Sequence, residues 1–244
     1  MNILKIGKAH VDIGSNCQDA IGRYGDELKI VCDGCSEGKH SEVGAQLFAK
    51  LFVEKYKYFA EKGKAITRER EGIKRLIQST MDDIVKVVGD DSNSVLNYLS
   101  FTTVISHECM LGDSDISFSE AFFIGDGYLI KVDNSKSEVS FIKLDCGEYP
   151  EYLSYNYLNQ ELLADYKNGA DTHYRVFDPR CIPRYANYKI GVASDGIRFV
   201  ADLPEDNPLR QEFVDIILSD RDIRMKRFIN KHPEIFKDDV SIVI

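Results

Sequence analysis

The sequence predicts an α+β fold in which helices cover mainly antiparallel β-sheets. Two helical patterns lie early in the chain, a run of strand-like segments fills its middle, and two more helical patterns precede a last strand. This order lacks the regular alternation of strand and helix that is typical of parallel sheets. No fixed-period repeat and no linker rich in Pro, Gly or Ser divides the chain. We therefore expect one domain over residues 1–244.

Apolar residues at helical spacing predict the helices. In residues 41–63, Val43, Leu47 and Leu51 recur every four residues, with Ser41 as the expected N-cap and Gly63 as the expected end. A second helix is predicted from about residue 67 to residue 88, where a polar loop over residues 89–94 ends it. Residues 209–218 and 221–231 show the same periodicity near the C-terminus.

Short segments rich in Val, Ile, Phe and Thr predict the strands. They comprise residues 3–6, 28–32, 99–106, 117–124, 128–132, 139–144, 174–177, 188–193 and 240–244. Four of the 6 prolines fall between Pro179 and Pro208, which predicts a loop-rich stretch there.

Composition excludes several classes of protein. The 244 residues are 43% hydrophobic and 29% charged, which is typical of a globular chain and not of a disordered or membrane-embedded one. The net charge of −9 argues against a nucleic-acid partner, because phosphate binding needs a basic face. Six scattered cysteines do not form a disulfide framework, and the first residues lack the apolar stretch of a secretory signal. We expect a cytoplasmic protein.

Four aspartates share one context, since each lies at the edge of a predicted strand. They are Asp19, Asp33, Asp195 and Asp238. Any single Asp-Gly pair after a strand is most simply a turn. Strand ends that are distant in sequence can nevertheless converge, and clustered carboxylates repel one another unless cations neutralise them. Such oxygen ligands select hard ions such as Mg²⁺ or Mn²⁺.

The order of the motifs resembles that of the type 2C metal-dependent protein phosphatases (PPM family), especially the bacterial branch. The matching pieces run from residue 17 to the C-terminus. They are Cys17-Gln18-Asp19-Ala20, Cys32-Asp33-Gly34, Ser41-Glu42-Val43-Gly44-Ala45, Thr102-Thr103, Gly125-Asp126-Gly127, Ala193-Ser194-Asp195-Gly196 and Asp238-Asp239. Each motif is short, but their joint order and spacing are fairly specific.

The resemblance implies a four-layer α-β-β-α sandwich with two Mg²⁺ or Mn²⁺ ions at one end. Asp33 would bridge both ions, the Gly34 carbonyl would ligate one, and Asp195 and Asp238 would hold the other. Asp19 would ligate an ion or hydrogen-bond its water, and Asp239 would be only a neighbour of the ligand Asp238. Two ions about 3.5–4 Å apart would activate a water for in-line attack on phosphoserine or phosphothreonine. Asp19 and Asp33 are therefore the expected catalytic residues.

Some relatives bind a third ion, and its expected ligands here are Asp126 or Asp145. The implied partners are a phosphorylated protein and a cognate Ser/Thr kinase or its targets, with no nucleic acid and no membrane. We expect a monomer that serves in signalling.

Two departures from the family pattern open an alternative. Many relatives have an Arg for the substrate phosphate where this chain has Gly14, and a His where it has Cys35. Lys8, Arg23 or Lys39 could supply the missing positive charge, although Lys imitates bidentate Arg binding poorly. The alternative function is a catalytically degenerate module that binds phosphoproteins. Retention of all four aspartates argues against it.

Two minor hypotheses concern cysteine and histidine. Cys32-Asp33-Gly34-Cys35 has the spacing of a thiol redox pair or of half a zinc site, but no second such pair exists. Cys32 is expected to face the core. His10 precedes the first motif closely enough to approach the site.

Overall fold

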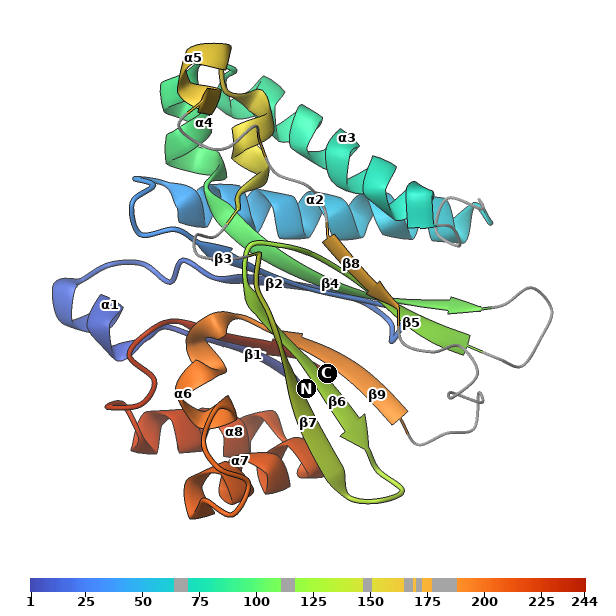
Figure 1. Ribbon diagram of the computed structural model, residues 1–244, viewed down its shortest axis with the longest axis vertical. Helices are drawn as coiled ribbons and strands as arrows, with labels where there is room; N and C mark the ends of the chain where they lie inside the picture. The colour runs from blue at the N-terminus through green and yellow to red at the C-terminus, as the bar shows by residue number, and fades with distance from the viewer. Residues whose placement is uncertain (64–69, 111–116, 147–150, 165–168, 170–172, 177–187) are drawn as a thin grey trace.

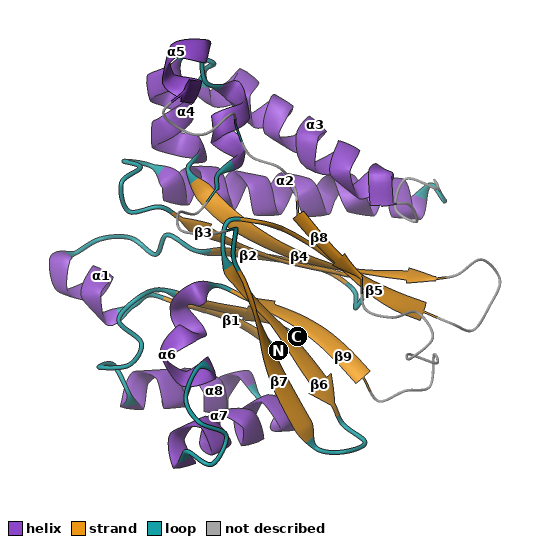
Figure 2. Ribbon diagram, viewed as in Figure 1, coloured by secondary structure: helices purple, strands orange, loops and turns teal. Residues whose placement is uncertain are grey.

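Two antiparallel sheets of five strands each lie face to face between layers of helices, as Figures 1 and 2 show. The computed structural model describes residues 1–63, 70–110, 117–146, 151–164, 169, 173–176 and 188–244. The first sheet has the order β2 (Ala20–Tyr24), β3 (Leu28–Gly34), β4 (Phe101–Met110), β5 (Ser117–Ile124) and β8 (His173–Val176). The second has the order β1 (Asn2–Lys5), β10 (Val240–Val243), β9 (Tyr188–Ala193), β6 (Gly127–Asp133) and β7 (Glu138–Leu144).

Helices cover the outer face of each sheet. The α-helices are α1 (Lys8–Ile13), α2 (Ser41–Glu61), α3 (Arg70–Val88), α4 (Ser92–Leu99), α5 (Gln160–Leu163), α6 (Arg198–Ala201), α7 (Pro208–Ser219) and α8 (Asp222–Lys231). Two 3₁₀ turns, η2 (Leu153–Tyr157) and η5 (Asp195–Ile197), complete the described helices. In Figure 1, α2 and α3 lie over the first sheet, and α7 and α8 lie over the second. The predicted α+β sandwich of four layers is confirmed.

The alternation of side chains along β3 explains why the core has three apolar layers. Ile30 and Cys32 point outward and pack with residues of α2 and α3 such as Phe48 and Ile84. Val31 points to the opposite face and packs with Val192 and other residues between the sheets. A third cluster joins α7 and α8 to the outer face of the second sheet. Because β3 is covered on both faces, apolar side chains such as Ile30, Val31 and Cys32 follow one another along it.

The sequence-based prediction was wrong about Leu99 and missed α4. Residues 89–94 were expected to be a loop and Leu99 the start of a strand, but Ser92–Leu99 is helical and β4 begins at Phe101. The Asp91 carboxylate caps α4 by accepting a hydrogen bond from Ser94 N at 3.0 Å. The polar run that indicated a loop is therefore the start of a helix, whose Val95 and Leu99 are buried.

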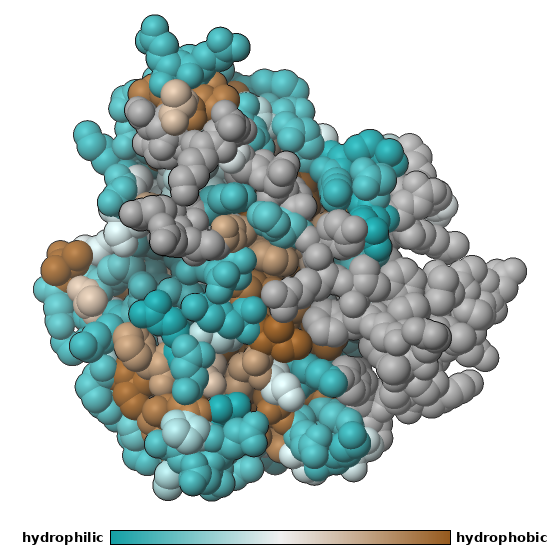
Figure 3. Space-filling model, in the orientation of Figure 1, coloured by the Kyte–Doolittle hydropathy of each residue, from teal (hydrophilic) through white to brown (hydrophobic). Residues whose placement is uncertain are grey.

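The helix α1 and strand β2 were also missed, because neither has a strong periodic pattern. No residue of α1 is buried, and Val11 and Ile13 are 53% and 77% exposed. Apolar side chains at α1 are visible in the space-filling view of Figure 3. The expected start of the second helix at residue 67 and the expected strand end at residue 177 lie outside the described residues, as does most of the proline-rich stretch. Within the described residues, no helix is both long and apolar enough to cross a bilayer.

Candidate metal centre

Strand pairing brings the four predicted aspartates, the carboxylate cluster, to one end of the sandwich. Asp19 immediately precedes β2, which pairs with β3, so Asp19 lies close to Asp33 at the end of β3. Asp195 lies two residues after the end of β9, and Asp238 lies two residues before the start of β10. Because β9 pairs with β10 at Ala193 and Ile242, these two aspartates also meet. The cluster therefore draws residues from both sheets.

Asp19 is fully buried, and neither of its carboxylate oxygens has a well-formed hydrogen bond within the described chain. Burial raises its pKa to about 7, an effect that the nearby hydroxyls of Ser241 and Ser194 reduce and the charge of Asp239 increases. A buried anion without partners is costly unless a cation or another donor satisfies it. Asp19 therefore has the environment expected of a metal ligand or of a residue that orients metal-bound water.

Asp33 lies at the centre of the cluster. Removal from water, and then the charges of Asp19, Asp195 and Asp238, raise its pKa well above the ordinary value of a carboxyl group. Asp195 has a pKa raised to about 6, first by burial and then by Asp126 and Asp238. In the described chain, no three of these carboxylates bring oxygens within 4.8 Å of one another. The cluster is therefore wider than a site for one small ion.

The structure distinguishes Asp238 from Asp239. Asp239 is buried, accepts hydrogen bonds from the backbone N–H groups of Gly7 at 2.7 Å and of Gln18, and lies 2.9 Å from His10 Nδ1. The Asp238 side chain is 56% exposed, and its charge acts on Asp33 and Asp195. Asp239 therefore holds the chain near α1. Asp238 accepts one hydrogen bond, at Oδ1 from the Asp239 backbone N–H at 2.9 Å, and its other carboxylate oxygen is available to the cluster.

Gly34 and Cys35 continue from Asp33 in a tightly packed turn. A Cβ atom at Gly34 would lie 2.9 Å from the Gln18 carbonyl oxygen and 2.9 Å from Ser41 Oγ, so only glycine fits there. Ser41 Oγ donates to the Cys35 carbonyl at 2.7 Å, which ties this turn to the start of α2. The Gly34 carbonyl as a metal ligand stays a prediction.

Cys32 and Cys35 are free thiols in different environments. Cys32 is buried in the core with its Sγ 3.3 Å from Thr103 Oγ1, and burial raises its pKa to about 12. A thiol with such a pKa is protonated at neutral pH and is a poor redox nucleophile. Cys35 instead lies beside the Tyr152 hydroxyl. The arrangement argues against the redox hypothesis.

Sequence reasoning missed Arg198, a cation that acts on Asp195. Burial raises the pKa of both Asp126 and Asp195, and the charge of Arg198 lowers each in part, joined at Asp126 by the charge of Lys143. The guanidinium is solvent-exposed and lies 5.3 Å from the centre of the Phe199 ring. Its position three residues after Asp195 was the only signal that could have indicated it.

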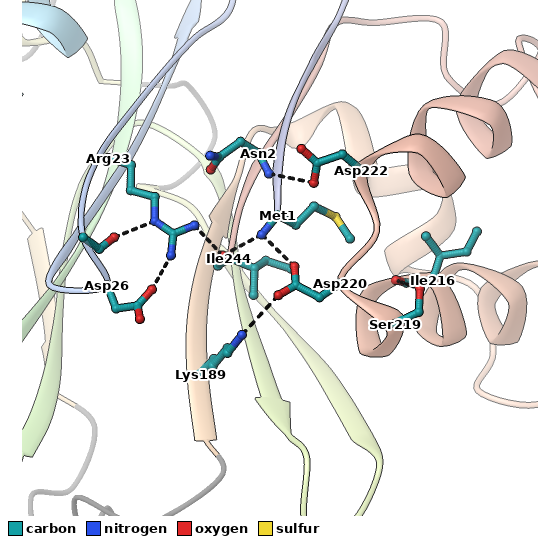
Figure 4. Close-up of polar contacts among 11 residues, drawn as sticks. Met1, Asn2, Arg23, Asp26, Lys189, Ile216, Ser219, Asp220, Asp222 and Ile244 are labelled. Carbon is teal, nitrogen blue, oxygen red and sulfur yellow. Dashed lines mark hydrogen bonds and ion pairs between the residues drawn. The ribbon is translucent and has the colours of Figure 1, made fainter.

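The sequence suggested three other cations, Lys8, Arg23 and Lys39, and each of them makes its contacts away from the four aspartates. Arg23 donates to the carbonyls of Gly25 at 2.5 Å and Ile244 at 3.1 Å and pairs with Asp26, as Figure 4 shows. Lys8 pairs with Asp12 on α1. Lys39 is exposed near α4.

Comparison with known proteins identifies the family. The model of the family described as protein phosphatase 2C matches residues 6–227. The chain belongs to the protein phosphatase 2C family. Since members of this family remove phosphate from phosphoproteins, the chain is a phosphoprotein phosphatase, as the motif order predicted.

Solved structures of low sequence identity share the protein phosphatase 2C fold. A bacterial serine phosphatase has a TM-score of 0.56 at 12% identity, with 99% of this chain and 94% of that chain covered. The serine/threonine phosphatase Stp1 from Staphylococcus aureus has a TM-score of 0.57 at 14% identity, with coverage of 99% and 92%. Serine-threonine phosphatase 2C from Toxoplasma gondii has a TM-score of 0.56 at 11% identity, again with 99% and 92% covered. No curated protein matches this chain in sequence.

Proposed function

We propose that this protein phosphatase 2C chain hydrolyses phosphoserine and phosphothreonine in proteins with Mg²⁺ or Mn²⁺ held by the carboxylate cluster. The observation that carries the proposal is Asp19, a buried carboxylate without well-formed hydrogen bonds that lies beside Asp33. The cluster offers only oxygen donors, which is the ligand chemistry that these hard cations prefer. Its width suits two ions rather than one.

Each residue of the cluster has a role that follows from its position. Asp33 lies between Asp19 on one side and Asp195 and Asp238 on the other, so it is the residue that could contact both ions. Asp195 and Asp238 converge from paired strands and would hold one ion together. Asp19 would orient the attacking water. When bound, the cations would activate that water and neutralise the substrate phosphate.

We assign the phosphate-binding charge to Arg198. The chain has Gly14 where relatives have an arginine, and Gly14 ends α1 in a left-handed conformation. Arg198 is exposed, acts on Asp126 and Asp195 and presents a guanidinium suited to bidentate phosphate binding. Asp126 and Asp145 remain the candidates for a third ion. Asp126 is the stronger one, because its charge acts on Asp195.

We also propose that the enzyme acts in the cytoplasm as a monomeric single domain, on targets of a protein kinase. Cys17, Cys32, Cys35 and Cys146 are all free thiols, which accords with a reducing compartment. A degenerate, merely binding module is disfavoured, because such a module has no reason to retain four mutually repelling carboxylates.

The test is hydrolysis of a phosphothreonine peptide and an aryl phosphate with Mn²⁺, with and without a chelator. We expect activity that the chelator removes and that Asp33→Ala and Asp238→Ala each reduce by about 1,000-fold, equivalent to about 4 kcal/mol of transition-state stabilisation. The matched control is Asp12→Ala on the exposed pair with Lys8, which should retain full activity. Phosphopeptide binding without turnover at any Mn²⁺ or Mg²⁺ concentration would instead support the degenerate module.

A further inference from the structure

Three side chains of the kinds that bind transition metals meet outside the carboxylate cluster. Cys146 follows β7, Glu151 precedes η2, and His173 begins the edge strand β8. Their thiol sulfur, a carboxylate oxygen and an imidazole nitrogen all lie within 4.8 Å of one another. Among the residues that the structure describes, no other three His, Cys, Asp or Glu side chains come so close.

Two of the three ligand atoms already have the separation that a bound ion requires. His173 Nε2 lies 3.2 Å from Glu151 Oε2. Around a tetrahedral zinc ion, with bonds of about 2.0–2.3 Å, ligand atoms are about 3.3–3.6 Å apart. The His173 ring is held in place by stacking on Phe123, with 5.4 Å between the ring centres. The imidazole and the carboxylate are therefore oriented before any ion binds.

The thiol of Cys146 is the third potential ligand. At present it donates to the Gly125 carbonyl oxygen at 3.0 Å. Burial, and then the charges of Glu151, Asp126 and Asp145, raise its pKa to about 11, so at neutral pH it is a protonated and unreactive thiol. Zinc binding would release the thiol proton to solvent, because the thiolate is the ligand form.

The site formed by Cys146, Glu151 and His173 is open enough for an ion to enter and exchange. The side chains of Glu151 and His173 are 31% and 40% exposed. With three protein ligands, one coordination position is left for water, which is typical of an exchangeable site rather than of a closed structural one. Sulfur and imidazole nitrogen select Zn²⁺ over Mg²⁺ and Mn²⁺.

We propose that Cys146, Glu151 and His173 bind one Zn²⁺ ion in a site separate from the carboxylate cluster. The ion would join the edge strand β8 to the segment after β7 and to Glu151. Cys146 contacts Gly125, the neighbour of Asp126, so the zinc charge would act beside the catalytic end of the molecule. Zinc is thereby a candidate modulator of the enzyme, distinct from the ions that its chemistry uses.

The test is a zinc titration of the full chain against a chromophoric chelator, with millimolar Mg²⁺ present to occupy the carboxylate cluster. We expect one tightly bound Zn²⁺ in the wild type and in Asp33→Ala. Loss of a ligand should weaken binding by more than about 100-fold in Cys146→Ser and in His173→Ala, since even outer-shell changes at zinc sites cost about 10–100-fold. Substitution of Co²⁺ should give a thiolate-to-metal absorption band that Cys146→Ser abolishes.

The matched control is His232→Ala, because His232 also pairs with a glutamate, Glu234, at 3.5 Å but lies on another part of the fold. It should bind zinc as the wild type does. Circular dichroism of each variant checks that the fold is retained. Zinc binding that survives in Cys146→Ser, or that disappears in Asp33→Ala, would overturn the proposal and assign the ion to other ligands.

Discussion

Asp33 lies among three other carboxylates, and its charge is therefore costly in the metal-free protein. Its pKa is raised by removal from water and by Asp19, Asp195 and Asp238. A carboxyl group whose pKa is higher in the folded than in the unfolded state destabilises the fold at every pH above its unfolded-state pKa, which includes neutral pH. The same charge becomes favourable only when cations are bound.

Asp33→Asn should therefore stabilise the metal-free protein and abolish its catalysis. The amide keeps the size of the side chain and removes one repelling charge. One pKa unit corresponds to about 1.4 kcal/mol, so we expect the free energy of unfolding to rise by about 1 kcal/mol or more in chelator at pH 7.5. Denaturant unfolding measures this change, and Asp12→Asn serves as the exposed control. An Asp33→Asn protein that is less stable than the wild type without metal would refute the electrostatic account.

Arg198 offers a second test at the level of one side chain. If it binds the substrate phosphate, Arg198→Ala should lower kcat/KM for a phosphopeptide by about 10- to 100-fold, because hydrogen bonds to charged groups contribute about 1.5–3 kcal/mol. Arg198→Lys should restore only part of this loss, since lysine lacks the planar fork. Steady-state kinetics measure both variants, with Lys8→Ala as control. Unchanged kinetics in Arg198→Ala would exclude the assignment.

Asp238 and Arg198 show what a sequence can indicate about single residues. The motif order placed Asp238 at the site, and the structure shows a reason for preferring it, since Asp239 is buried and bonded to Gly7 and Gln18. Arg198 was missed, because an exposed arginine in a short helical turn has no local signature beyond its closeness in sequence to Asp195. Its relevance depends on β9 and β10 bringing distant segments together.

At the scale of elements, periodic apolar residues predicted most of the strands and the long helices correctly. Such patterns reflect burial, so they are strong in β3 and α3, which contribute many core residues. The short helix α1 buries none of its residues, and α4 begins with a polar capping sequence that resembles a loop. The helices that sequence patterns missed are therefore held by a cap or by few contacts, whereas β2 was missed because it has no strong periodic pattern.

The contact between α2 and α4 depends on Gly44. A Cβ atom at this position would lie 1.7 Å from the Tyr98 carbonyl oxygen of α4, so a side chain would force the two helices apart. We expect Gly44→Ala to lower the free energy of unfolding by about 1–3 kcal/mol, the usual cost of overpacking, despite alanine's higher helix propensity. Thermal unfolding checks this result. Gln46→Ala on the exposed face of α2 is the control, and a Gly44→Ala protein as stable as that control would contradict the close approach.

At the scale of the whole molecule, the carboxylate cluster joins two sheets that otherwise meet through apolar packing. Asp33 comes from the first sheet, and Asp195 and Asp238 adjoin strands of the second. Between the sheets, the packing consists of apolar side chains such as Val31, Leu129 and Val192. Bound cations would therefore add a polar connection at one end of a largely apolar interface.

Metal binding should stabilise the whole fold and protect the strand ends beside the cluster most strongly. At a Mn²⁺ concentration 100 times the dissociation constant, the free energy of unfolding should rise by about 2.7 kcal/mol. Bound metal should slow the exchange of backbone amide hydrogens more at Gly34, Ser194 and Val240 than along α7 and α8. Local opening of the chain beside the carboxylate cluster must then release the ions. Asp33→Ala should lose both effects. Uniform protection over α7, α8 and the strand ends would show that the ions stabilise the fold only globally and do not tie the sheets together at this end.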